Sequence, residues 1–418
     1  MHEGLIARRM EMAAETDIEP KENRATGPVK VKNIGLRGVT VADTKISYID
    51  GVNGILIYRG YRIEELAEQS SFEETAYLLL YDKLPDSAEL RAFIERLKQE
   101  RGMPGFVINA LRAIPVNAAP MDVLQAAVPV LAAADPTMED DSREANLSRA
   151  VRLIARLPVV VAAWHRIRRG LEPVSPDDAL SHAENFLWML HARRPDEDAA
   201  KDFDTALVLH ADHTFNPSTF ACREVVSTRA HMYAGVAAGI GALSGSLHGG
   251  ANAEVMKMLI ELREERDIAG WVEDQLDKGN RIMGMGHAVY KTMDPRAAFL
   301  KKICERLSRK TGQGYWCGLS NRIEEAAVAE FEKRGKPFIR PNVDFYSAPV
   351  YHLMGIPADM MTPVFAISRI AGWTAHIIEE KFGDAQERPA LYRPASEYVG
   401  NYCGKTGCAY IPLERRSG

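Results

Sequence analysis

The sequence predicts an all-α protein with one short β-hairpin near its N-terminus. Amphipathic stretches of helical length, separated by prolines, follow one another from about residue 60 onward. Segments with the two-residue period of a strand are few after that point. Apolar residues make up 46% of the 418-residue chain and charged residues 26%, which is an ordinary globular balance. A chain of this length buries a sizeable core without needing disulfides or structural metals.

The sequence pattern typical of β-strands lies between residues 44 and 59. Apolar and polar residues alternate over 44–50 (TKISYID), the turn-forming GVNG follows, and ILIYR occupies 55–59. Two alternating runs joined by a glycine-containing turn predict a hairpin. The first helix signal after it is the capping-box pair Ser71 and Glu74, which precedes an apolar face that includes Phe72 and Leu79.

Composition divides the chain into four parts. Residues 1–33 are charged, lack periodicity and predict an N-terminal arm. We expect a large helical domain over 34–249, a smaller helical domain inserted over 250–356, and the rest of the large domain with a C-terminal tail over 357–418. The glycine-rich flanks of the inserted part predict hinges, because glycine accepts large dihedral changes at little cost.

Charge and composition exclude several classes of protein. A net charge of −5 and no basic excess give no electrostatic reason to expect a nucleic-acid partner. No uninterrupted apolar run of about 18 residues predicts a membrane span. The N-terminus lacks the apolar region of a signal peptide, and five scattered cysteines favour reduced thiols over a secreted disulfide scaffold. The expected location is cytoplasmic.

Two histidine-containing segments are candidates for chemistry. In LHADH, His210 and His213 lie three residues apart and could grip a metal, although a partly buried helix end would show the same pattern. In SGSLHGGAN, His248 lies in a glycine-rich turn before a helix for which Asn252 is the predicted N-cap. The positive end of that helix dipole disfavours imidazolium, so a neutral His248 could donate a hydrogen bond to a developing oxyanion.

Further candidates follow along the chain. RIMGMGHAVYKTMDPR places His287 among glycines and adds Lys291 and Arg296, a combination that suits an anionic substrate. Asp344, in PNVDFYS, has apolar and aromatic neighbours that could raise the pKa of its carboxyl group and make it a general base, although an Asp that only caps a helix is the commoner case. The remaining candidate carboxylate clamps are Arg369 and Arg393.

In order, the segments LHADH, LHGGAN, GMGHAVYKTMDPR, PNVDFYS, ISRIAGW and YRPASEYVG resemble the citrate synthase family. The likeness extends back to SYIDGVNGILIYRGYRIEELA and covers roughly residues 34–400. It implies a two-domain helical fold, a homodimer, and closure over oxaloacetate to complete the acetyl-CoA site. The implied reaction is condensation of acetyl-CoA with oxaloacetate and hydrolysis of citryl-CoA, with neither a metal nor a redox cofactor.

The resemblance also assigns roles to residues. The catalytic residues would be His248, which holds the thioester carbonyl, His287, which polarises the ketone, and Asp344, which removes the methyl proton. Oxaloacetate would be bound by His213, Arg296, Arg369 and, from the partner subunit, Arg393. Coenzyme A would contact Arg281, Ile282, Met283, Gly284 and Lys291.

The resemblance leaves alternatives open. A 2-methylcitrate synthase would use propionyl-CoA with the same residues, since one methylene changes selectivity by only about 1–3 kcal/mol. A more distant alternative is a metal-dependent hydrolase built on His210 and His213. Ala395 stands where many relatives carry a second cation, for which Arg388 is a candidate substitute. The short arm lacks room for the N-terminal domain of hexameric, NADH-inhibited relatives, so a dimer without NADH control is expected.

Overall fold

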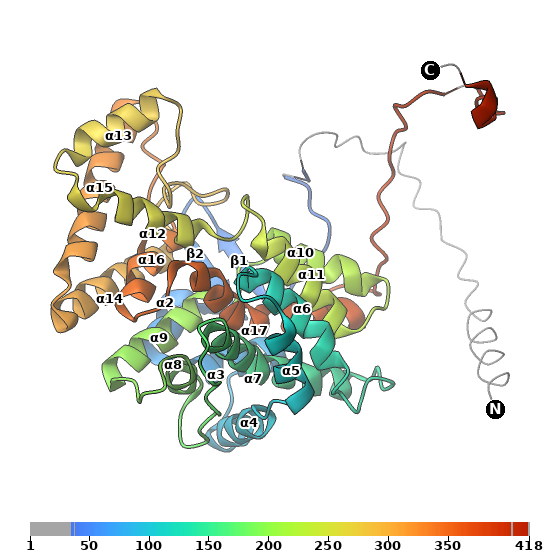
Figure 1. Cartoon of the computed structure of the whole chain (residues 1–418), viewed down its shortest axis with the longest axis horizontal. Coiled ribbons are helices and arrows are strands. Elements are labelled where there is room, and N and C mark those ends of the chain that lie inside the picture. Colours follow the sequence, from blue (N-terminus) through green and yellow to red (C-terminus); the bar gives the residue numbers. More distant parts are fainter. Residues whose placement is uncertain (1–34, 37, 403, 417–418) are drawn as a thin grey trace. The chain divides into compact units, whose positions relative to one another are not determined.

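The computed structural model describes residues 35–36, 38–402 and 404–416 (Figure 1). The predicted N-terminal arm, 1–33, lies outside the described residues. Residues Ala42–Tyr392 form one compact unit. A second unit contains the described residues 35–36, 38–41, 393–402 and 404–416.

The predicted β-hairpin is confirmed, and a short third strand extends it. Strands β1 (Ser47–Asp50), β2 (Ile55–Tyr58) and β3 (Tyr61–Arg62) form an antiparallel sheet in that order. The third strand follows from the turn at Arg59 and Gly60, which both have positive φ. Two successive left-handed residues make the tight turn that reverses a strand onto its neighbour. With only two residues, this strand is too short to show a periodic pattern in the sequence.

The rest of the described chain is helical, which confirms the all-α class. The first ten helices are α2 (Ile63–Gln69), α3 (Phe72–Tyr81), α4 (Ser87–Glu100), α5 (Gly105–Ala113), α6 (Pro120–Ala132), α7 (Arg143–Ile167), α8 (His182–His191), α9 (Glu197–His210), α10 (Pro217–Ser227) and α11 (Met232–Ser244). The others are α12 (Ala251–Glu261), α13 (Ile268–Asp277), α14 (Pro295–Thr311), α15 (Gly314–Lys333), α16 (Val343–Leu353) and α17 (Met361–Phe382). Short 3₁₀ turns cover Leu262–Glu264, Ala358–Met360 and Leu413–Arg415.

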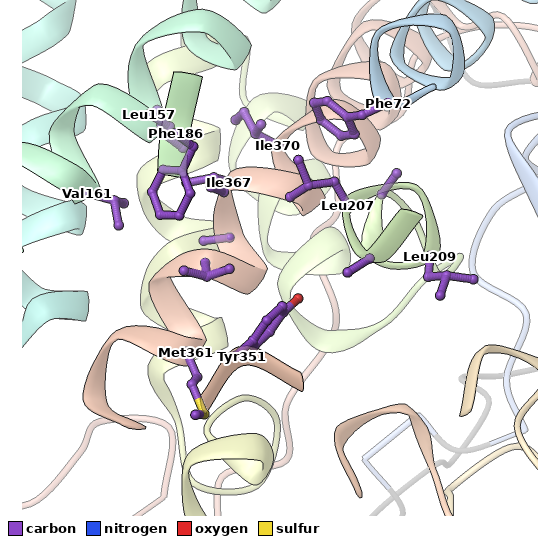
Figure 2. Packing of buried hydrophobic residues seen from close by; sticks show 14 of the residues in the cluster. Phe72, Leu157, Val161, Phe186, Leu207, Leu209, Tyr351, Met361, Ile367 and Ile370 are labelled. Carbon is purple, nitrogen blue, oxygen red and sulfur yellow. The ribbon is translucent and has the colours of Figure 1, made fainter. Parts of the chain in front are cut away.

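Helix α17 is the central element of the core. Almost every one of its residues is buried, and it packs against α3, α7, α9, α10 and α11. Figure 2 shows Ile367 and Ile370 of this helix among side chains from α3, α7, α8 and α9. A helix that is apolar all round belongs in the middle of a large core, where burial of its side chains is the main stabilising term. This rigid centre carries Arg369.

Helices α12 to α16, yellow to orange in Figure 1, gather on one side of the compact unit. Helix α16 packs against α12, α14 and α15, and α13 packs against α15. These five helices correspond to the inserted domain expected over 250–356. The domain boundaries stay a prediction.

The described C-terminal segment, from Arg393 onward, is exposed along its length. Cys222, Cys304 and Cys317 are buried free thiols, whereas Cys408 is disulfide-bonded. The expectation of reduced thiols is therefore wrong for Cys408, which lies in this exposed segment, outside the packed core that encloses the three free thiols. Among the described helices, none is both long and apolar enough to cross a membrane.

Candidate active site

A cleft of about 1060 Å³ is lined by residues from both halves of the compact unit. Its lining comes from the segment 213–217 between α9 and α10, the turn from α11 into α12, and α17, together with the segment 279–289, the start of α14, and the ends of α15 and α16. Five predicted site residues, distant in the sequence, line it together: His213, His248, His287, Arg296 and Arg369. The structure therefore gathers most of the predicted catalytic and oxaloacetate-binding residues.

A short backbone pairing joins the His287 segment to the start of α16. The Gly286 N–H donates to the Arg340 carbonyl at 2.8 Å, and the Asn342 N–H donates to the Gly284 carbonyl at 2.9 Å. Gly284 has a φ of +78°, and a Cβ there would lie 2.9 Å from the Phe345 Cα. Only glycine allows this approach. The pairing places His287 and Asp344 in adjoining segments.

His213 and His210 have different surroundings despite their spacing. His213 lines the cleft, and its Nε2 lies 3.3 Å from the Tyr290 hydroxyl. His210 is fully buried, and its Nδ1 lies 2.7 Å from the Ala206 carbonyl of its own helix. Burial lowers the pKa of His210 to about 3. Only His213 faces the cleft, so the two histidines do not form a metal-binding pair there.

His248 lies in the turn between α11 and α12. A Cβ at the next residue, Gly249, would lie 1.9 Å from the Leu243 carbonyl oxygen, so this turn requires glycine. The predicted N-cap was wrong: Gly250, with a φ of +79°, caps α12, and Asn252 is buried inside the first turn. The positive φ at Gly250 lets the chain enter the helix two residues earlier than the side-chain pattern indicated.

Hydrogen bonds fix the neutral form of His248. Its Nε2 accepts from the Ser218 N–H at 3.2 Å and lies 2.9 Å from the Ser218 hydroxyl. That hydroxyl accepts from the Trp373 indole N–H at 3.1 Å. Because Nε2 is an acceptor, the proton of the neutral ring is on Nδ1. Burial lowers the pKa of His248 to about 4, which keeps the ring neutral at pH 7.

His287 is held as the opposite tautomer. Its Nδ1 accepts from the backbone N–H groups of Val289 at 3.0 Å and Tyr290 at 3.2 Å. The proton of the neutral ring is therefore on Nε2. Burial lowers the pKa of His287 to about 4. The ring centroids of His287 and His213 lie 5.3 Å apart, so the two imidazoles are neighbours in the cleft.

Asp344 is the second residue of α16. Its backbone N–H donates to the side chain of the N-cap Asn342 at 3.0 Å. Asn342 and Val343 line the cleft directly beside it. A helix N-terminus favours a carboxylate, yet burial outweighs that effect and raises the pKa of Asp344 to about 6. A carboxyl group with this pKa is ionised at pH 7 and is a competent general base.

Two of the arginines that line the cleft, Arg296 and Arg369, are buried and held by the protein. Arg296, at the start of α14, donates from Nε and Nη2 to the Asp294 carboxylate at 2.9 and 2.7 Å. Arg369 donates from Nε to the His210 carbonyl at 2.8 Å, and its guanidinium lies 4.6 Å from the Phe365 ring centroid. Burial lowers the pKa of Arg369 to about 10, so it stays charged. Much of the charge of Arg296 is already balanced by Asp294.

The predicted coenzyme A residues divide into two groups. The cleft is lined by Arg281, Ile282, Met283 and Gly284. Lys291 is exposed, does not line the cleft, and lies with its Nζ 6.0 Å from the Phe338 ring centroid. The backbone N–H of Lys291 donates to the Gly51 carbonyl at 2.7 Å, which holds this part of the segment against the β1–β2 turn.

Several cleft residues were not predicted from the sequence. Arg334 and Lys336 also line the cleft and add positively charged side chains to it. Ser218 and Tyr290 contact the histidines described above, and Phe365 lies beneath Arg369. The glycines around His248 and His287 were the only local signal in these segments. The residues that support the histidines come from other helices, and no spacing pattern marks them.

Arg393 begins the C-terminal unit and is exposed, as is Arg388. The predicted contribution of Arg393 to a partner subunit's site stays a prediction. Among the described residues, no group of three or more His, Cys, Asp or Glu side chains is arranged to hold a metal ion.

The fold and the cleft are those of an enzyme: imidazoles and buried arginines meet in one cleft, and the Asp344 carboxyl group lies next to the lining residue Val343. Residues 35–395 match the family described as citrate synthase, C-terminal domain. The chain is 44% identical over 371 residues to citrate synthase from Haloferax volcanii, covering 88% of this chain and 95% of that protein. It is 39% identical over 367 residues to 2-methylcitrate synthase from Mycobacterium tuberculosis, covering 88% and 90%.

Comparison with solved structures gives the same family as the sequence comparison. A solved ternary complex of carboxymethyl coenzyme A and oxaloacetate with citrate synthase from Thermoplasma acidophilum is 33% identical, with a TM-score of 0.83, covering 91% of this chain and 99% of that one. The chain belongs to the citrate synthase family. It is a transferase of the citrate synthase type, as the sequence predicted.

Proposed function

We propose that this enzyme condenses acetyl-CoA with oxaloacetate and hydrolyses the resulting citryl-CoA to citrate and coenzyme A. The observation that carries the proposal is the meeting of three neutral histidines and two arginines in one cleft, beside a carboxyl group with a pKa near 6. The ligands named for the Thermoplasma acidophilum complex support the substrate assignment.

In this proposal the first step is removal of a proton from the acetyl methyl group by the Asp344 carboxylate. The thioester α-proton is a very weak acid, so the negative charge that develops on the thioester oxygen must be stabilised as it forms. The Nδ1–H of His248 is the donor for that oxygen. Its supporting bond from Ser218 fixes the tautomer before substrate arrives, so no reorganisation is needed during the reaction.

The second step forms the carbon–carbon bond. The enolate carbon attacks the ketone carbon of oxaloacetate, and the Nε2–H of His287 donates to the ketone oxygen as it gains charge and a proton. Water then cleaves the thioester of citryl-CoA, which releases citrate and coenzyme A. None of these steps needs a metal or a redox cofactor. Water must be excluded until condensation is complete, which suits a cleft with glycine-rich flanks that can close.

Oxaloacetate carries two carboxylates, and we assign them to His213, Arg296 and Arg369. Because Asp294 already balances much of the charge of Arg296, the three side chains assigned to oxaloacetate are short of positive charge for a dianion. Arg393 from a second subunit supplies the missing cation, which makes the active form a homodimer. Coenzyme A is assigned to the 281–284 segment, with Arg334 and Lys336 close enough to the cleft to meet its phosphates.

The test is the loss of thioester absorbance with oxaloacetate plus either acetyl-CoA or propionyl-CoA, in the presence of EDTA. Faster turnover of acetyl-CoA supports the proposal. Faster turnover of propionyl-CoA would instead favour 2-methylcitrate formation, the activity named for the Mycobacterium tuberculosis relative. Loss of activity in EDTA would instead favour the alternative that the protein is a metal-dependent hydrolase. We place the enzyme in the cytoplasm, and fractionation of cells expressing the natural chain tests this.

A further inference from the structure

A buried charged cluster joins the middle of α10 to the C-terminal end of α17. Arg223 is fully buried, and its Nη1 and Nη2 lie 2.6 Å from Glu379 Oε2 and 2.7 Å from Glu380 Oε2. Both glutamates are 1% exposed. The ring centroid of Phe215 lies 4.5 Å from the guanidinium carbon of Arg223. Two carboxylates against one guanidinium leave a surplus of buried negative charge, which is costly unless further donors meet it.

Two further donors reach this cluster. The Lys45 backbone N–H donates to Glu379 Oε1 at 2.8 Å, and the Tyr392 hydroxyl donates to Glu380 Oε2 at 3.0 Å. Burial, and then the nearby Glu380 charge, raise the pKa of Tyr392, so its hydroxyl keeps the proton that it donates. A hydrogen bond to a buried carboxylate is among the stronger kinds in a protein.

Tyr392 is held at two more points. Its backbone N–H donates to the Ser227 hydroxyl at 3.3 Å, and its ring meets Phe220 edge to face with centroids 5.6 Å apart. These contacts fix it against α10 and α17. Tyr392 is also the last residue of the compact unit Ala42–Tyr392, and the next residue is the exposed Arg393. Consecutive Cα atoms are about 3.8 Å apart, so the position of Tyr392 restricts where Arg393 can begin.

We propose that Tyr392, anchored through Glu380 to the Arg223 cluster, is a positioning residue that sets where Arg393 enters the partner subunit's oxaloacetate site. This inference rests on the proposed function, in which Arg393 acts in the partner. Its consequence is specific: a defect at Tyr392 of one chain appears in the active site of the other chain. A residue that served only the stability of its own chain would not behave in this way.

The first test is Tyr392→Phe, which removes the hydroxyl and keeps the ring contact with Phe220. We expect the KM for oxaloacetate to rise about three- to tenfold. Only part of the free energy of the lost hydrogen bond contributes to the position of Arg393, so the loss in oxaloacetate binding is smaller than the loss of the bond itself. The kcat and the KM for the thioester should change less than about twofold. The matched control is Tyr398→Phe, which removes an exposed hydroxyl that donates to the Asn401 carbonyl, and it should change nothing.

The decisive test uses mixed dimers purified through two different tags, in which one chain carries Asp344→Asn and is silent. When Tyr392→Phe is on the silent chain, the working site receives its Arg393 from the altered chain, and the KM for oxaloacetate should rise. When Tyr392→Phe is on the active chain instead, the KM should match that of the mixed dimer without this substitution. The reverse pattern, or an equal rise in both dimers, overturns the inference.

Controls separate this inference from the proposed function. A wild-type enzyme that forms no citrate, or an Arg393→Ala variant with an unchanged KM for oxaloacetate, contradicts the proposed function itself. If both of those behave as proposed and Tyr392→Phe still leaves the KM unchanged, only the positioning role is wrong.

Discussion

Replacing the proposed base by its uncharged isostere should make the protein more stable. Asp344→Asn keeps the size of the side chain and its place at the second position of α16. In the wild type the carboxylate is ionised at neutral pH despite burial that disfavours its charge. The substitution removes that unfavourable charge, so stability and activity should move in opposite directions, as expected for a catalytic group held in an unfavourable environment.

The size of the effect follows from the pKa of Asp344. Burial raises that pKa from 3.8 to about 6 in the folded protein. One pKa unit corresponds to 1.36 kcal/mol, so the shift sets an upper limit of about 3 kcal/mol. Because the side chain is only partly buried and retains some solvent, we expect about 1–3 kcal/mol. The folded state binds this proton more tightly, so wild-type stability should fall as the pH rises from about 4 to about 6 and then level off.

The assay is urea unfolding of both proteins at pH 7.5 and at pH 4.5, at one fixed protein concentration, since dimerisation makes stability depend on concentration. Asp344→Asn should be more stable at pH 7.5, and its gain should be about a third as large at pH 4.5, where folded Asp344 is neutral but the unfolded carboxyl is mostly ionised. Asp178→Asn, at an exposed position, is the matched control and should show no gain. An equal gain at both pH values, or none at either, would refute the reasoning.

Other consequences of the site concern catalysis and binding. Between pH 7 and pH 5 the kcat/KM should fall about tenfold as Asp344 takes up its proton, while His248 and His287, with pKa values near 4, stay neutral; a flat profile would remove Asp344 as the base. Arg369→Ala should weaken oxaloacetate binding at least about tenfold, measured as KM or by calorimetry, and unchanged affinity would exclude it from the clamp. Ser218→Ala keeps its backbone N–H but loses the hydroxyl 2.9 Å from His248, so kcat should fall about tenfold with little change in the KM for oxaloacetate; an unchanged kcat would show that the N–H alone suffices.

The sequence was most informative where chemistry depends on local backbone. Glycines beside His248 and His287 marked turns that only glycine can form, and the structure shows these turns at Gly249 and Gly284. The hairpin and the helical class followed from periodicity over many residues. Errors came at element ends: Asn252 fits an N-cap pattern, but the positive φ of Gly250 moves the cap.

Contacts between distant segments could not be predicted. Ser218 of α10 precedes His248 by more than 25 residues, and Trp373 of α17 follows it by more than 120. Ser218 contacts the His248 ring and Trp373 contacts the Ser218 hydroxyl, yet nothing in their own segments signals this role. Only the family resemblance assigned Lys291 to coenzyme A. In the structure Lys291 is exposed and its backbone N–H donates to the Gly51 carbonyl, and its contact with coenzyme A stays a prediction.

The proposed enzyme makes citrate from acetyl-CoA and oxaloacetate in this cleft, with Asp344 as the base. The most direct test measures citrate formed and thioester consumed by wild type and by Asp344→Asn, with and without oxaloacetate, in EDTA. We expect one citrate per thioester, dependence on oxaloacetate, and a rate about 10²–10⁴ times lower in the variant. A variant as fast as wild type, or thioester loss without citrate, would contradict it.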